Sequence, residues 1–168
     1  MTVFLSGLCE ALRKLENPEH VGSTLLHEVA RAFECQWGNY WQVQGNILRS
    51  LAYWSDPSIL AKRLEDDVKS HTMASGAGTA AHVWRKGHAF WSHDLTLDMC
   101  LPRSLEAAQA GLTAGLWIPL KRHQNVFAIL ELLSRRLPRS IGKNRAAELD
   151  QIGVEAGKLV QPGSKRAL

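Results

Sequence analysis

Thiols are the most nucleophilic side chains in this sequence, and their spacing limits what they could do. The three cysteines, Cys9, Cys35 and Cys100, lie far apart and form no Cys-x-x-Cys motif. Thiol redox catalysis requires a nucleophile and a resolving cysteine close together. An odd number of dispersed cysteines is typical of a reducing compartment. The spacing therefore predicts a cytoplasmic protein without thiol catalysis and makes Cys100 a small, semi-buried residue, while a redox role for it stays open.

Four histidines in the middle of the chain are the second group that could do chemistry: His71, His82, His88 and His93. No two of them form a His-x-x-x-His pair on one helical turn, and no acidic residue stands as a clear third ligand. This pattern is typical of surface or hydrogen-bonded histidines, so we predict no metal site. The sequence identifies no cofactor, and a haem or metal sensor remains an alternative.

Tryptophan is unusually frequent for a chain of this size. The six residues are Trp37, Trp41, Trp54, Trp84, Trp91 and Trp117. A tryptophan buries a large area whatever its role, so core packing is the favoured interpretation for most of them. Aromatic walls also suit flat or apolar ligands, which leaves a binding role open for some.

Length, composition and charge set the class of protein. The chain has 168 residues, of which 45% are hydrophobic and 21% charged, as in ordinary globular domains. Residues 1–120 carry 10 Lys and Arg against 12 Asp and Glu, whereas residues 121–168 carry 10 against 4. Phe127 is the one aromatic residue in that basic quarter, so a solvated basic face is favoured over nucleic-acid binding. No apolar run is long enough to span a membrane, and the first residues do not read as a signal peptide.

Hydrophobic periodicity predicts one α+β domain with helices at both ends. We expect helices over residues 3–15, 17–33, 59–73, 80–86 and 103–110, and a last helix after Pro138. We expect strands over residues 35–44, 47–54, 88–93, 112–120 and 126–134, the last of them central to a sheet. The predicted organisation is an N-terminal helix over residues 1–16, a domain over residues 17–160 and a flexible tail over residues 161–168.

Three stretches of this sequence resemble the GAF domain, a relative of the PAS sensor fold. The first is a glycine turn at residues 76–78, a short helix ending in Trp84-x-x-Gly87 and a strand that closes on Asp94. The second is Gly115 to Leu120, a strand that ends in proline and an aliphatic residue. The third is Ala128 to Ser134, with an acidic residue before the final serine. The resemblance covers roughly residues 18–160.

The resemblance implies an antiparallel sheet of about five to six strands, with the N- and C-terminal helices on one face and a pocket on the other. It implies a non-catalytic sensory domain of a signal-transduction protein, which binds a small molecule and regulates an attached or associated output domain. It also implies a homodimer formed through the terminal helices. Short helices and loops would form the pocket.

Candidate ligand-binding residues follow from this resemblance. Three lie on strands that flank the pocket in related domains, two lie on segments that border it, one matches a cysteine of some bilin-binding photoreceptors, and one is an arginine that could meet a phosphate. In that order they are Trp54, Trp91, Trp117, His71, His93, Cys100 and Arg103. A covalent bilin is not expected, because the Cys-His pair that anchors it is missing from residues 105–110.

One enzyme class shares the GAF fold, the free methionine sulfoxide reductases. These enzymes carry a cysteine cluster before the penultimate strand, and residues 109–115 hold no cysteine here. We therefore expect no enzyme. The alternative from another class is a ligand-free dimerisation or scaffold module whose pocket is filled by its own tryptophans.

Overall fold

The computed structural model describes residues 6–7, 10, 14, 21–97, 103–136 and 143–160. Its centre is a six-stranded antiparallel sheet in the order β3-β2-β1-β6-β5-β4. The strands are β1 (Trp37–Gln44), β2 (Ile47–Ser55), β3 (Thr72–Ala74), β4 (Phe90–Ser92), β5 (Ala114–Arg122) and β6 (Asn125–Ser134). The helices are α2 (Val21–Ala32), α3 (Lys62–Ser70), α4 (Gly78–Lys86), α5 (Ser104–Gln109) and α6 (Lys143–Leu159). The predicted α+β class is confirmed, and β6 lies inside the sheet as expected.

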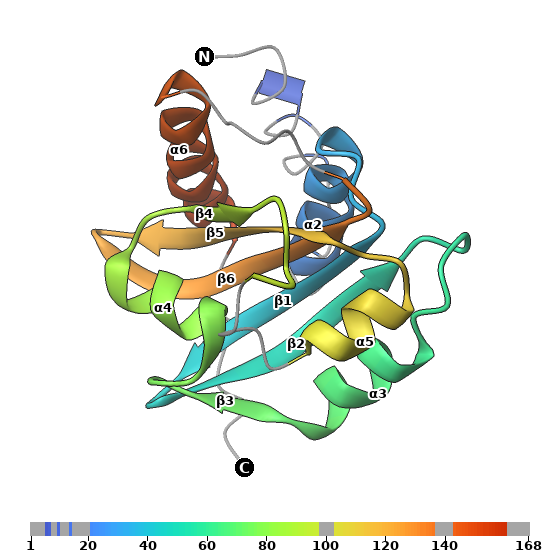
Figure 1. Cartoon of the computed structure of the whole chain (residues 1–168). Coiled ribbons are helices and arrows are strands. Elements are labelled where there is room, and N and C mark those ends of the chain that lie inside the picture. The colour runs from blue at the N-terminus through green and yellow to red at the C-terminus, as the bar shows by residue number, and fades with distance from the viewer. Residues whose placement is uncertain are drawn as a thin grey trace.

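The helices divide between the two faces of the sheet, as Figure 1 shows. Helices α2 and α6 cover one face, and the shorter α3, α4 and α5 lie on the other. Because successive side chains of a strand point to opposite faces, strands β1, β2, β5 and β6 each contribute to two separate hydrophobic cores. We call them the long-helix core, under α2 and α6, and the short-helix core, under α3, α4 and α5.

Helix α6 lies directly on the backbone of β5. A Cβ atom added to Gly153 would stand 2.1 Å from the Pro119 carbonyl oxygen, and one added to Gly157 would stand 2.0 Å from that of Lys121. Both distances are far below van der Waals contact, so only glycine permits this approach. Leu149, Ile152 and Ala156 of this helix are buried in the long-helix core, and the last helix predicted after Pro138 is confirmed.

The prediction for residues 59–73 is wrong at its C-terminal end. Helix α3 ends at Ser70, and Met73 lies in β3, paired with Leu48 at the edge of the sheet. Gly45 lies in the turn that joins β1 to β2, with φ of 60°, and Gly87 ends α4 as predicted, with φ of 68°. These left-handed values favour glycine.

Parts of the predicted organisation lie outside the described residues. The separate helix proposed over residues 1–16 is described only at four positions, and the tail over residues 161–168 not at all. Within the described part of the chain, no helix is both long and apolar enough to cross a membrane.

Candidate functional site

Polar side chains cross the centre of the sheet on its short-helix face. Register pairs Asn39 of β1 with Glu131 of β6, and Glu131 with Trp117 of β5. All three side chains are fully buried. Ser50 of β2 extends the line by donating a hydrogen bond of 2.6 Å from its hydroxyl to Asn39 Oδ1. We call these four residues the polar row.

Arg103 is buried and contacts the polar row from the side of α3 and α5. Its Nη2 donates to both carboxylate oxygens of Glu131, at 2.6 and 2.9 Å, and Trp117 Nε1 donates to Glu131 Oε2 at 3.0 Å. Arg103 Nη1 lies 3.5 Å from Asp67 Oδ2 of α3. One guanidinium therefore joins α3 and the start of α5 to the sheet. It pairs with two carboxylates, those of Glu131 and Asp67.

Indole rings line the same face. The Trp41 ring lies under the Arg103 guanidinium, with 5.0 Å from the guanidinium carbon to the ring centroid. The Trp37 ring stacks on Tyr53 at 5.8 Å with an interplanar angle of 19°. Trp37, Trp41 and Trp117 are all fully buried in the short-helix core. The result is a closed site that combines flat apolar surfaces with buried hydrogen-bonding groups.

Several N–H donors on this face have no acceptor among the described residues. They are Trp37 Nε1, Asn39 Nδ2, Trp41 Nε1 and Arg103 Nε. The first three belong to alternating positions of β1 and so point to the same face of the sheet. Leaving such a group buried without a partner costs roughly 1–3 kcal/mol.

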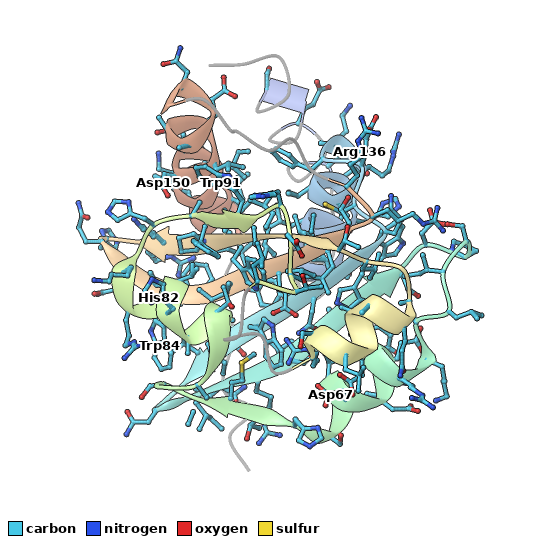
Figure 2. The ribbon with its side chains drawn as sticks, viewed as in Figure 1. Asp67, His82, Trp84, Trp91, Arg136 and Asp150 are labelled. Atoms are coloured by element: carbon cyan, nitrogen blue, oxygen red, sulfur yellow. The ribbon has the colours of Figure 1, made fainter. Side chains whose placement is uncertain are left out.

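The structure brings together two of the seven predicted site residues, Arg103 and Trp117, through Glu131. Trp54 and Trp91 lie on the opposite face, packed against the long-helix core. Trp54 meets His27 of α2 edge to face at 5.3 Å. Figure 2 shows Trp91 and Asp150 of α6 on the side of the sheet away from Asp67.

The remaining three predicted residues are not in the polar row. His71 is exposed at the end of α3, where its Nδ1 lies 3.0 Å from Asp67 Oδ1. His93 is exposed after β4. Cys100 lies outside the described residues, as does Cys9.

The sequence contained a signal for the residues that our prediction missed. Glu131 is the one charged residue in the otherwise apolar stretch 126–134, and Asn39 interrupts an aromatic strand. A charge in the middle of a central strand must find a partner when it is buried. Only the fold reveals that the partner of Glu131 is Arg103.

Other chemically reactive groups lie away from the polar row. Burial raises the pKa of the Cys35 thiol to about 12. Among the described residues, no group of three His, Cys, Asp or Glu side chains is arranged to hold a metal ion.

A family model for the GAF domain matches residues 4–160. The chain belongs to the GAF domain family. The resemblance noted in the sequence is thereby confirmed over almost the whole chain. No curated protein matches this GAF domain in sequence.

Solved structures share the fold at low identity. The GAF domain of a phosphoenolpyruvate-protein phosphotransferase from Coxiella burnetii is 12% identical with a TM-score of 0.73, covering 94% of this chain and 90% of that one. A GAF domain/HD domain protein from Geobacter sulfurreducens is 16% identical with a TM-score of 0.67, covering 93% and 95%. The free methionine-R-sulfoxide reductase of Neisseria meningitidis, solved with its substrate, is 15% identical with a TM-score of 0.70, covering 93% and 85%.

Proposed function

We propose that this GAF domain is a non-catalytic, cytoplasmic sensory domain that binds a small molecule at the polar row. The observation that carries the proposal is the set of buried polar side chains, Asn39, Glu131 and Arg103, on the short-helix face. A face that serves only to pack is usually apolar, because buried charges cost free energy even when they are paired. A buried patch that is both polar and aromatic, in a fold that commonly serves regulation, favours a binding site.

Access to the polar row is proposed to come from movement of α3 and α5. Among its described residues, α3 buries Leu64 and Val68, and α5 buries Ala107. Polar contacts hold them as well, namely the ion pairs of Arg103 with Asp67 and Glu131 and the exposed 2.7 Å hydrogen bond from Arg63 Nη1 to Gln109 Oε1. Elements with few buried apolar contacts open at the lowest free energy.

Strand β5 offers a short route from the polar row to α6. Trp117 belongs to the polar row, while its neighbours Leu116 and Ile118 belong to the long-helix core under α6. A ligand that moved the Trp117–Glu131 hydrogen bond would act on the same strand that Gly153 and Gly157 contact. Such a shift is limited by the difference in the ligand's affinity for the two arrangements.

A second link joins β4 to α6. Just before β4, the Ala89 backbone N–H donates a hydrogen bond of 2.7 Å to Asp150 Oδ1 of α6, and His88 Nδ1 lies 2.9 Å from Asp150 Oδ2. Because β4 pairs with β5 beside Trp117, Asp150 couples the edge of the sheet to the helix. We propose that α6 passes the signal to an attached or associated output domain, and that two copies pair through their terminal helices.

A scaffold without a ligand is the second candidate. It is favoured by one observation, the complete burial of Trp37, Trp41 and Trp117, which fill the short-helix face.

The likeness to the methionine-R-sulfoxide reductases is one of fold. Residues 109–115 of this chain hold no cysteine, which supports the non-catalytic proposal.

Native mass spectrometry of the purified chain tests the proposal. We expect a dimer that carries an additional non-protein mass. A dimer without added mass supports the scaffold, and a bare monomer contradicts both ligand binding and signalling through paired helices.

Two variants separate binding from transmission in the same experiment. Glu131→Gln removes the charge of the polar row while keeping its shape, so the added mass should be lost. Asp150→Asn acts on the opposite face, so the added mass should be kept. Equal loss in both variants would indicate a general effect on folding and contradict a site at the polar row.

A further inference from the structure

We infer that the ligand of the polar row is a small, planar, uncharged molecule rich in hydrogen-bond acceptors, such as carbonyl oxygens or ring nitrogens. The inference rests on the proposed function and adds the chemical class of the ligand. It is carried by four N–H donors on one buried face that have no acceptor among the described residues, namely Trp37 Nε1, Asn39 Nδ2, Trp41 Nε1 and Arg103 Nε.

The side-chain oxygens of Glu131 and Asn39 already accept hydrogen bonds from the chain itself. The two oxygens of Glu131 accept three hydrogen bonds, from Arg103 and Trp117, and Asn39 Oδ1 accepts from Ser50. The donors that remain are neutral, apart from the Nε of Arg103. A molecule that brings acceptors therefore completes the hydrogen bonding of the site, whereas one that brings donors competes with bonds that exist.

Charge distinguishes an uncharged ligand from an anion. Arg103 lies between Glu131, at 2.6 Å, and Asp67, at 3.5 Å. The two carboxylates outnumber the guanidinium, so an additional anion would meet net negative charge in a buried place where such repulsion is strong. From the sequence, Arg103 was a candidate to bind a phosphate group; in the structure its guanidinium pairs with the chain's own carboxylates.

Shape follows from the aromatic residues. The Arg103 guanidinium lies over the Trp41 ring, and the Trp37 ring is stacked on Tyr53. Indole faces bind planar groups by stacking, and their N–H edges donate in the ring plane. A flat heterocycle can therefore use both the faces and the edges of these rings.

The indole N–H signals of the intact, ¹⁵N-labelled chain test this inference by NMR. The probe is 1,3-dimethyluracil, which has two carbonyl acceptors and no N–H donor. Benzoate serves as the anionic comparison and toluene as the apolar one. Trp37→Phe and Trp41→Phe assign the two signals, and Trp54, on the opposite face, is the internal reference.

We expect 1,3-dimethyluracil to move the Trp37 and Trp41 N–H signals downfield and to leave Trp54 unchanged. Loss of one buried hydrogen bond should weaken its binding about tenfold in Trp41→Phe, with no change in the matched control Trp54→Phe. If Trp41→Phe proves poorly folded, Trp37→Phe gives the same comparison.

Three results would overturn the inference: unmoved Trp37 and Trp41 signals, tighter binding of benzoate, or equal binding of toluene. Benzoate or toluene binding at these signals would overturn the ligand class and leave the proposed sensory function standing. Failure of all three probes, together with a bare chain in native mass spectrometry, would remove both.

Discussion

Arg103 and Glu131 form a buried ion pair whose two halves depend on each other. Removing one partner from such a pair leaves an uncompensated charge and typically costs about 3–5 kcal/mol, whereas replacing both is often nearly neutral. Arg103→Met should therefore lower the free energy of unfolding by about 3–5 kcal/mol. Arg103→Met with Glu131→Gln should recover most of that loss, because no buried charge remains on the pair. Urea denaturation of the single and double variants measures both values.

An exposed ion pair of the same length provides the control. Lys62 pairs with Asp66 on α3, with both side chains more than half exposed. Lys62→Met should change the free energy of unfolding by less than about 1 kcal/mol. A loss for Arg103→Met as small as this would show that the buried pair is not a stabilising link.

Burial should protect the Cys35 thiol from labelling. With its pKa raised to about 12, the reactive thiolate is a very small fraction of the population at neutral pH. In a Cys9→Ser, Cys100→Ser variant, a disulfide reagent at pH 8 should react with Cys35 only as fast as the domain unfolds. Immediate labelling of the folded domain would contradict this prediction, and labelling in urea is the positive control.

At the scale of elements, the contact of α6 with β5 depends on two glycines. Replacing a helical glycine by alanine normally stabilises a helix by up to about 1 kcal/mol. At Gly157 the new methyl group would stand 2.0 Å from the Lys121 carbonyl oxygen, so the sign should reverse. We expect Gly157→Ala to destabilise the domain by about 1–3 kcal/mol, measured by thermal and urea unfolding.

Gly22 of α2 is the matched control on the same face. A Cβ atom there would stand 3.5 Å from the Tyr40 ring, an ordinary van der Waals distance. Gly22→Ala should therefore be neutral or stabilising. Similar losses at Gly22 and Gly157 would mean that the close approach of α6 to β5 does not decide the outcome.

The turn after β4 should contribute to acid sensitivity. Thr96 donates two hydrogen bonds to Asp94, and they lower the pKa of that carboxyl below its ordinary value of 3.8. A lowered pKa in the folded state gives stability that is complete above 3.8 and is lost as pH falls through the folded-state value. The free energies of unfolding of Asp94→Asn and the parent should therefore differ near pH 6, and the difference should shrink as the pH falls below 3.8. A constant difference would contradict the assignment.

At the scale of the whole molecule, the spacing of hydrophobic residues along the chain predicted the strands and most helices. It did not predict on which face of the sheet each side chain lies. From the buried Leu48, strict alternation would put Trp54 on the short-helix face. The register of β1 and β2 shifts between Tyr40 and Trp41, and this bulge turns Trp54 to the opposite face. A one-residue slip is invisible in composition, so the sequence could not place Trp54 on the long-helix side.

Long-range partners were equally hard to predict. Arg103 and Glu131 are 28 residues apart, and no local pattern relates them. Strand β3 was missed because it has three residues and Met73 continues the apolar spacing of the helix before it.

Signalling through α6 predicts that the phase of the helix matters. One alanine inserted after Val160 rotates everything beyond it by about 100°, whereas seven residues nearly restore the direction. In a protein with an output domain after α6, the single insertion should change the output and the seven-residue insertion should preserve it. An unchanged output after the single insertion would contradict transmission through a continuous helix.

The paired glycines of α6 also restrict how the domain can move. Gly153 lies against the Pro119 carbonyl oxygen of β5, and Gly157 lies against that of Lys121. Sliding the helix toward its C-terminal end by about 6 Å, which is four residues at the rise of 1.5 Å each, would bring Leu149 from its place four residues before Gly153 to the Pro119 carbonyl oxygen. A piston stroke of that length is therefore blocked, whereas the two glycine contacts leave α6 free to tilt away from the sheet or to travel with β5 as one rigid body.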